Sequence, residues 1–327
     1  MMRRIATILC AGLALAVTLA VPADVVAKNY PERPIRLVVA YAPGAATNNI
    51  ARIIAGGLAE RLGQPVVVEN RPGGSGQIGS QHVASAAPDG YTLLIATQAT
   101  HAVAPYMHAN LGFDPIADFT PITLAVYSPL VLVTNLDVPV SNLQELIAYV
   151  RKNRGKVSYA TGGVGTNSHM AALLLNSVTG LDAAAIPHQG EGPAIPQIVG
   201  GHLPYMFSSV PSAAPFITSR QVRALGVTGA ARAPMLPDVP TIAEAGLKDF
   251  EVATWWAILG PARLPNDIVT KLNAELVNVI KDPSVRDRIT HMGYEIRGTG
   301  VQELADYMKL ENERWAKVIK EQGLTAK

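Results

Sequence analysis

The sequence of 327 residues contains a single cysteine and few charged residues. That cysteine, Cys10, lies in the apolar N-terminal segment, so the rest of the chain has neither disulfides nor a cysteine nucleophile. Charged residues make up only 16% and apolar residues 49% of the chain, a composition too apolar for a disordered protein. The length corresponds to about two domains, each with enough apolar residues for its own core.

The sequence also lacks the short motifs of several enzyme classes. It has no Gly-x-Ser-x-Gly elbow and no His-Glu-x-x-His, and no Gly-Lys-Ser/Thr follows its glycine-rich turns, which excludes a P-loop. Ser75, Ser168 and Ser209 have no activating base that the sequence reveals. His101 and His108 are seven residues apart with no third ligand nearby, so we expect surface histidines and no metal. A hydrolase whose triad assembles only in the folded chain stays an alternative.

The N-terminus is typical of a secretory signal peptide. Arg3 and Arg4 precede an apolar run from Ile5 to Leu19, and the alanines that follow suit cleavage after Ala23 or Ala27. A membrane anchor is the alternative, but the run is shorter than the ~20 residues that a membrane span needs. We therefore expect residues 1–27 to be a signal peptide and the mature protein to be exported from the cytoplasm.

Cleavage also changes the charge balance. Residues 1–23 contain two of the 27 basic residues and none of the 25 acidic ones, so the remaining chain is formally neutral. A neutral surface argues against nucleic acid as a partner, because nucleic-acid binding needs a basic patch.

The stretch 34–70 predicts a strand, a loop, a helix and a second strand. An apolar, β-branched run at 35–40 is followed by the break Pro43-Gly44, and Thr47 or Asn48 can then cap a helix that ends at Gly63. The second strand is Val66–Val68. Because the first amides of a helix are unpaired and the helix dipole favours negative charge there, this loop is a candidate anion site.

Several segments of the chain carry a family resemblance. The segments PIRLVV, APG, AR, LGQPVVVENRPGGSGQIG and AAPDGYTLLIAT resemble the Bug family, the periplasmic solute-binding proteins of the tripartite tricarboxylate transporter. Members usually read Pro-Pro-Gly-Gly in the first loop with an acid four residues after the first glycine. Here the first proline is Ala42, the second glycine is Ala45 and the acid is Asn48.

The turn Gly74-Ser75-Gly76-Gln77-Ile78-Gly79 formally matches the dinucleotide-binding pattern Gly-x-Gly-x-x-Gly. It follows a strand and precedes an expected helix at 81–87, so the context alone does not reject the match. Arg71-Pro72-Gly73 lengthens the turn, however, and nicotinamide cofactors are scarce outside the cytoplasm. We favour a structural glycine turn that lets backbones pass closely, and we expect no cofactor.

Polar residues follow the other predicted strands. Thr97 and Gln98 end a buried strand at 91–96, where α/β sheets place their ligands. A glycine-rich turn at 161–166 follows a second strand, and Thr166 or Asn167 can cap a helix that begins near His169. For His169 itself, a bond to the local backbone is the alternative to ligand binding.

Two later corners differ from the family. Members usually read Pro-Tyr-Lys-Gly and Phe-Asp where this chain has Pro187-His188-Gln189-Gly190 and Phe207-Ser208. Together with Asn48, three formally charged positions are therefore neutral, so a ligand would be held without an ion pair at them. We expect backbone N–H groups of residues 44–47 and 163–166 to receive the oxygens of an anion.

The alternation of strands and helices predicts an α/β protein with parallel sheets and helices on both faces. The resemblance implies a type II periplasmic binding protein, in which two α/β domains are joined by two crossover strands and hold the ligand in the cleft between them. We expect domain 1 to comprise residues 28–124 and 229–327, and domain 2 to comprise residues 125–228.

The resemblance implies a non-enzymatic, monomeric protein that captures a small carboxylate and delivers it to the subunits of a membrane transporter. The alternatives are an exported carboxylate sensor that docks a signalling receptor and a secreted hydrolase. The expected ligand-binding residues are Tyr41, Pro43, Gly44, Ala45, Ala46, Thr47, Asn48, Thr97, Gln98, Gly163, Val164, Gly165, Thr166, Asn167, His169, His188, Gln189 and Ser208.

Overall fold

The computed structural model describes residues 30–43, 46–248, 250–321 and 323. The expected signal peptide and the loop residues Gly44 and Ala45 lie outside these ranges. The strands are β1 (Ile35–Val39), β2 (Val66–Asn70), β3 (Thr92–Thr97), β4 (Phe119–Thr134), β5 (Ser158–Thr161), β6 (Ala184–Pro187), β7 (Tyr205–Ser209), β8 (Arg223–Val227), β9 (Ala253–Pro261) and β10 (Glu295–Ile296). The α-helices are α2 (Ala46–Leu62), α3 (Gln77–Ala84), α4 (Ala104–Met107), α5 (Leu143–Lys152), α6 (Asn167–Thr179), α7 (Glu191–Val199), α8 (Val210–Thr218), α9 (Asn266–Lys281), α10 (Pro283–His291) and α11 (Val301–Glu321). A 3-10 turn, η1 (Gly74–Gly76), precedes α3, and a π-helix, η2 (Ala99–Val103), precedes α4.

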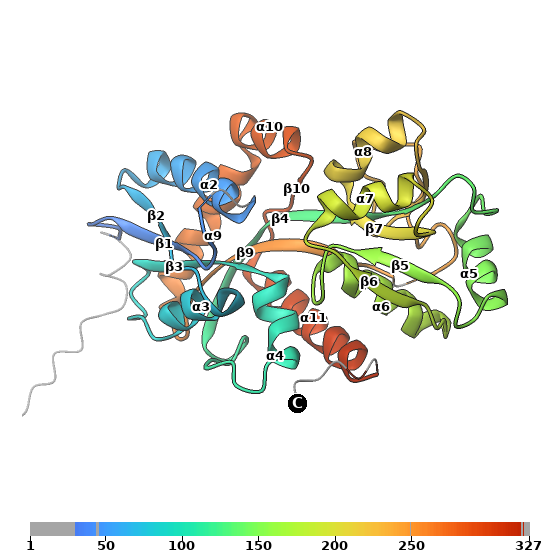
Figure 1. The fold of residues 1–327 in the computed structure, drawn as a ribbon. Coiled ribbons are helices and arrows are strands. Elements are labelled where there is room, and N and C mark those ends of the chain that lie inside the picture. Colours follow the sequence, from blue (N-terminus) through green and yellow to red (C-terminus); the bar gives the residue numbers. More distant parts are fainter. Residues whose placement is uncertain (1–29, 44–45, 249, 322, 324–327) are drawn as a thin grey trace, which may run out of the picture.

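These elements form two α/β domains joined by two long strands, β4 and β9 (Figure 1). The strand order is β2-β1-β3-β9-β4-β7-β5-β6, with β8 and β10 also paired to β4. The first part of β4, residues 119–129, pairs with β9, and its last part, residues 130–134, pairs with β7. The chain thus crosses between the domains in β4 and returns in β9, which confirms the expected pair of crossover strands.

The sheet is mixed, which corrects the expectation of parallel sheets. The strands β1, β2 and β3 are parallel, as are β5, β6 and β7. In contrast, β9 runs antiparallel to both β3 and β4, and β4 runs antiparallel to β7 and β8. The relative direction of these strands was not predictable from the sequence, because a continuous apolar run indicates a buried strand but not whether it runs parallel or antiparallel to its neighbours.

Local sequence signals explain many element ends. Gly63 ends α2 with a φ of 67°, in the left-handed region that favours glycine. Asn142 caps α5, since its side chain accepts a hydrogen bond from the Glu145 amide at 2.9 Å. The Glu145 carboxylate accepts in return from the Ser141 amide at 2.6 Å. This reciprocal pair resembles a capping box.

Several helix expectations were wrong. The helix after the glycine turn starts at Gln77 rather than Gln81, and α7 runs unbroken through Pro193 and Pro196. The helix α8 was not expected, because its two prolines, Pro211 and Pro215, weaken any helical pattern. A proline in the first turn is tolerated, since the N–H that it lacks would have no partner there.

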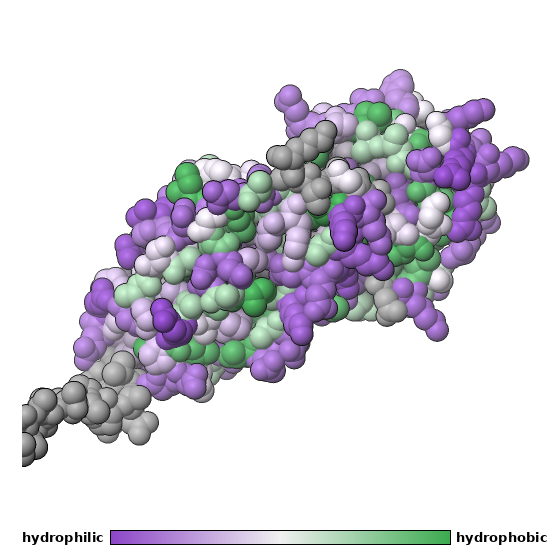
Figure 2. Space-filling view, turned by 90° about the horizontal axis from the view of Figure 1, so that it is seen from below, coloured by the Kyte–Doolittle hydropathy of each residue, from purple (hydrophilic) through white to green (hydrophobic). Residues whose placement is uncertain are grey.

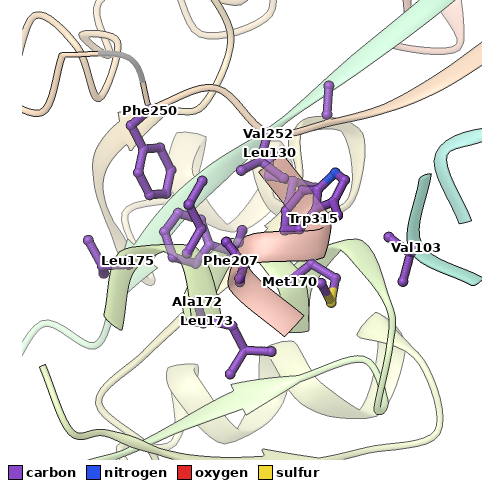
Figure 3. Close-up of a cluster of buried hydrophobic side chains, with 14 of the residues drawn as sticks. Val103, Leu130, Met170, Ala172, Leu173, Leu175, Phe207, Phe250, Val252 and Trp315 are labelled. Atoms are coloured by element: carbon purple, nitrogen blue, oxygen red, sulfur yellow. The ribbon is translucent and has the colours of Figure 1, made fainter. Parts of the chain in front are cut away.

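One buried hydrophobic cluster extends through both domains. It includes Val103 of η2 in the first domain, Met170 of α6 and Phe207 of β7 in the second, and Trp315 of α11. In Figure 3, Trp315 lies beside Met170, and Val103 belongs to the same cluster, so α11 contributes to the packing of both domains. The Glu311 carboxylate further links α11 to β9, because it accepts from Trp255 Nε1 and Trp315 Nε1 at 3.1 Å each.

The molecule is elongated, and the face shown in Figure 2 carries hydrophobic and hydrophilic residues interspersed along its length. Among the described residues, no helix combines the length and the apolar character that a membrane crossing requires.

Candidate functional site

The candidate site lies where both domains present the carboxyl ends of their parallel strands. In the first domain, β1 leads to α2 and β3 leads to η2; in the second, β5 leads to α6 and β6 leads to α7. The crossover strand β9 contacts the start of a helix from each domain. Trp256 Nε1 donates to Thr47 Oγ1 of α2 at 2.8 Å, and Asn167 Nδ2 of α6 donates to Thr254 Oγ1. Since residues two apart on a strand share a face, the two helix N-termini meet on one side of β9.

The first turn of α2 forms one wall. Thr47 and Asn48 are both buried there, inside the helix rather than at the N-cap position that we expected. Asn48 Oδ1 has no hydrogen-bond partner among the described residues. Tyr41 and Thr97 lie beside each other, because their hydroxyl oxygens form a 2.8 Å hydrogen bond.

Gln98 lies at the end of β3, next to this wall. Its side chain is 0% exposed, yet neither Oε1 nor Nε2 has a hydrogen-bond partner among the described residues. A buried amide without partners is unusual, because leaving a polar group unsatisfied costs about 1–3 kcal/mol. An unmet hydrogen-bonding demand of this kind is expected where a bound molecule supplies the partners.

The π-helix after Gln98 corrects our expectation for His101. This histidine is buried rather than on the surface, and its ring packs against Phe113 and Phe119 at centroid distances of 5.6 and 4.7 Å. Its Nδ1 forms a 2.8 Å hydrogen bond with Thr100 Oγ1. Burial lowers the pKa of His101 to about 3, so the ring is neutral and belongs to the core.

The glycine-rich loop before α6 forms the opposite wall, and it satisfies most of its own amides. Gly163 N donates to Thr161 Oγ1 at 3.3 Å, and Gly165 N donates to His169 Nδ1 at 3.2 Å. The Thr166 hydroxyl donates to Gly163 O at 2.7 Å. The His169 ring therefore binds the local backbone, and burial lowers its pKa, which keeps it neutral.

These bonds change which donors are available in the second domain. The N-cap residue of α6, Thr166, bonds through its hydroxyl to Ser168 Oγ at 3.0 Å but not to a backbone amide, so within the described part of the chain its side chain leaves the first amides of α6 uncapped. The free donors of this wall are thus the amides of Asn167, Ser168 and His169, rather than those of Gly163 and Gly165. Together with the helix dipole they make this end of α6 suited to an anion.

The corner that follows β6 lies against this loop. His188 N donates to Thr161 O at 2.9 Å and Gly190 N donates to Gly162 O at 3.0 Å. Gln189, the next residue after His188, is exposed. The corner therefore lies beside the loop mainly through its backbone.

The residue that follows this corner carries a carboxylate that we did not single out from the sequence. Glu191, in the first turn of α7, accepts from Ser208 Oγ at 3.1 Å, from Ser209 N at 3.0 Å and from Ser209 Oγ at 2.6 Å. The Ser208 hydroxyl thus uses its proton on Glu191. The corner holds an acid even though Ser208 replaces the usual aspartate, because Glu191 supplies the carboxylate from a neighbouring element.

Glu191 also faces an aromatic pair. Burial and the Glu191 carboxylate raise the pKa of Tyr294, which keeps this phenol protonated. The Tyr294 ring lies 5.2 Å from the Trp256 ring, centroid to centroid. Thr47, Trp256, Tyr294 and Glu191 therefore form a chain of neighbours from the first domain, across β9, to the second.

The glycine turn at 74–79 fits its expected structural role. A Cβ on Gly79 would lie 2.8 Å from the Cα of Ala40, so only glycine allows α3 to pass β1 so closely. The residue in the middle of the turn, Ser75, lies on the wall of a cavity of about 340 Å³ together with Gly165 and Thr166 of the second domain.

The structure thus brings most of the expected residues to one region, including Tyr41 with Thr97, Thr47 with β9, and residues 163–169 with His188. Gly44 and Ala45 lie outside the described residues; Pro43 is exposed, Val164 is 64% exposed, and Ala46 is partly buried at the start of α2. Sequence reasoning missed Glu191, Thr254, Trp256 and Tyr294. Their only signals were the Trp255-Trp256 pair and an acid placed directly after an atypical corner.

Comparisons with known proteins identify the family of this chain and similar folds. A family model described as "Tripartite tricarboxylate transporter family receptor" matches residues 50–324. The "UPF0065 protein in tcbD-tcbE intergenic region" of Pseudomonas sp. strain P51 is 40% identical over 97% of this chain and 94% of its own length. The structure titled "R. palustris Rpa4515 with adipate" is similar at a TM-score of 0.72 and 32% identity, over 91% of this chain and 100% of that one. The structure titled "MatC (Rpa3494) from Rhodopseudomonas palustris with bound malate" has a TM-score of 0.69 and 34% identity, over 89% of this chain and 100% of that one.

Proposed function

This chain belongs to the tripartite tricarboxylate transporter receptor family, and we propose that it binds a small organic carboxylate in the cleft between its domains and delivers it to a membrane transporter. The similar structures with bound adipate and malate support a carboxylate as the ligand class. In this proposal the protein works in the periplasm after loss of its signal peptide.

The observation that carries the proposal is the pair of unsatisfied polar side chains directly after β3 and in the first turn of α2. Gln98 is fully buried with both side-chain polar atoms unpartnered among the described residues, and Asn48 Oδ1 is in the same condition. A carboxylate oxygen accepts the hydrogen bond that Gln98 Nε2 offers. A ligand hydroxyl or amine, or a bound water, donates to the two side-chain oxygens.

The negative charge of the ligand is balanced by helix N-termini rather than by a cationic side chain. The uncapped first turn of α6 provides three amides, and α2 begins on the same side of β9. Hydrogen bonds that involve a charged group contribute about 1.5–3 kcal/mol each, so a few of them account for micromolar affinity.

Capture proceeds by domain closure about the crossover strands. The strand that pairs with β4 changes from β9 to β7 between Pro129 and Leu130. Ala253, the first residue of β9, pairs with Pro129. Small rotations at these residues move the first turn of α2 relative to that of α6, because each helix belongs to a different domain.

The ligand leaves chemically unchanged in this proposal. No serine hydroxyl in the described part of the chain forms a hydrogen bond with a histidine, and His169 already uses Nδ1 to accept from Gly165. Ser168 Oγ instead accepts from Gly162 N at 2.9 Å. A serine hydrolase needs a serine activated by a base, and the bonds of Ser168 and His169 do not supply that pair.

The test is a thermal-shift screen of carboxylates against residues 28–327, followed by mass analysis of the recovered ligand. A ligand at about 100 times its dissociation constant should stabilise the protein by about 2.7 kcal/mol, equivalent to a few degrees in Tm. The ligand should be recovered intact after long incubation. A hydrolysed ligand, or no stabilisation by any carboxylate, would contradict the proposal.

A further inference from the structure

A cavity of about 340 Å³ adjoins the candidate site and is shared by the two domains. The first domain contributes Ala99, Val103 and Met107 to its wall, and the second contributes Val164, Gly165 and Thr166. The walls are close, since a Cβ placed on Gly165 would lie 3.4 Å from Met107 Sδ. Two residues of its wall are sequence neighbours of the proposed anion site. Ala99 directly follows Gln98, and Thr166 directly precedes the first residue of α6.

The side chains around this cavity are mainly apolar, and they come from firmly held elements. Val103 is 3% exposed and belongs to the hydrophobic cluster that spans both domains (Figure 3). Opposite it, Val164 is 64% exposed at the tip of the glycine loop, between Gly163 and Gly165 with φ values of 132° and 77°. Hydrogen bonds from Gly163 N to Thr161 Oγ1, from Gly165 N to His169 Nδ1 and from Thr166 Oγ1 to Gly163 O hold the loop, and with it the position of Val164 at the cavity.

Among the described residues, His108 is the one titratable side chain that lines this cavity, and no aspartate, glutamate, lysine or arginine does. A second carboxylate placed there would lose water and have a single, solvent-exposed imidazole as its partner, which is unfavourable. In contrast, methylene groups or an aromatic ring would gain from leaving water. The volume is large enough, since an apolar cavity of about 150 Å³ already accommodates benzene.

We infer that the ligand is an amphipathic carboxylate whose apolar body, a ring or a chain of several methylene groups, occupies the cavity between Val103, Met107 and Val164. Its carboxylate group binds at Gln98 and the first amides of α6. This inference rests on the proposed function and narrows its ligand class: compact polyanions such as malate and citrate are poor ligands.

The test is calorimetric titration with acetate, butanoate, hexanoate, benzoate, malate and citrate. Affinity should rise about fourfold for each added methylene until the cavity is filled, and benzoate should bind more tightly than acetate. Tighter binding of malate or citrate than of hexanoate and benzoate would overturn the inference and leave the proposed function intact. If none of the six binds, the proposed function itself is overturned.

Variants locate the apolar body. Val164→Ser should weaken hexanoate binding about tenfold and change acetate binding less than twofold. Val178→Ser is the matched control, because Val178 is 54% exposed near the other end of α6 and does not line the cavity. Ala99→Leu should fill part of the cavity and reduce hexanoate binding while acetate still binds. Equal effects of the Val164 and Val178 variants on hexanoate would place the apolar body elsewhere and overturn the inference.

Discussion

Replacing Gln98 by methionine should make the unliganded protein more stable and the binding of carboxylates weaker. The Gln98 side chain is fully buried and neither of its polar atoms has a partner among the described residues. Methionine has a similar length and shape without the amide, so the substitution removes an unsatisfied group and leaves little space empty. Evolution retains such a costly group mainly where function needs it.

The expected gain follows from the cost of a buried unsatisfied group, which is about 1–3 kcal/mol. We therefore expect Gln98→Met to raise the free energy of unfolding, measured by urea denaturation without ligand, by about 1–2 kcal/mol. Calorimetry on the same variant should show a 10- to 100-fold weaker dissociation constant, since one hydrogen bond to a charged group is lost.

Asn312 provides a matched control, because it is a buried amide whose partners are present. Its Nδ2 donates to His101 O and Met308 O at 2.9 Å each, and its Oδ1 accepts from Tyr106 OH at 3.3 Å. Asn312→Leu should lower the free energy of unfolding by about 2–3 kcal/mol and leave the dissociation constant unchanged. Our reasoning would be refuted if Gln98→Met destabilised the protein as much as Asn312→Leu does, or if it bound carboxylates as well as the parent.

Three further predictions concern other residues. Burial lowers the pKa of His101 from 6.5 to about 3 on folding, so below pH 6.5 the unfolded chain binds a proton that the folded chain does not. The folded state therefore has its full stability above pH 6.5 and loses part of it as the pH falls towards 3. Between pH 6.5 and 4.5 the parent should therefore lose about 2–3 kcal/mol more than His101→Phe in urea denaturation; equal losses would contradict the neutral histidine. Asn48→Asp should weaken carboxylate binding by up to ~3 kcal/mol, the unscreened repulsion between two negative charges ~5 Å apart at a dielectric of ~20. Asn48→Ala should weaken it by about 1 kcal/mol, the loss of one hydrogen bond. If calorimetry finds equal affinity for the Asp variant and the parent, no ligand anion lies near residue 48. Asn142→Ala removes the N-cap of α5 and should lower the free energy of unfolding by about 1 kcal/mol without altering ligand affinity, whereas a change in affinity would show that α5 communicates with the cleft.

The parts of the fold that the sequence predicted well are those with local signals. The helix end at Gly63 and the glycine turn at 74–79 each depend on residues near them in sequence. That two strands connect the domains followed from the family resemblance. The antiparallel direction of β9 did not, because its partners in β3 and β4 are more than 100 residues away.

The candidate site shows the same limit. Polar strand ends such as Thr97 and Gln98 were identifiable from their position after an apolar run. The link between Glu191 and Ser208 was not, since nothing local indicates that an acid on one helix replaces an acid on a neighbouring strand. The donors of the glycine loop were also misassigned, because Gly165 donates to His169 only in the folded loop.

A crystal structure of residues 28–327 with a bound carboxylate tests the central claim most directly. We predict the carboxylate group within hydrogen-bond distance of Gln98 Nε2 and of the first amides of α6, with both domains contacting the ligand. The claim would be contradicted if Gln98 stayed without a partner while the ligand occupied another site, such as the cavity of about 330 Å³ between Pro129, Val210 and Tyr294.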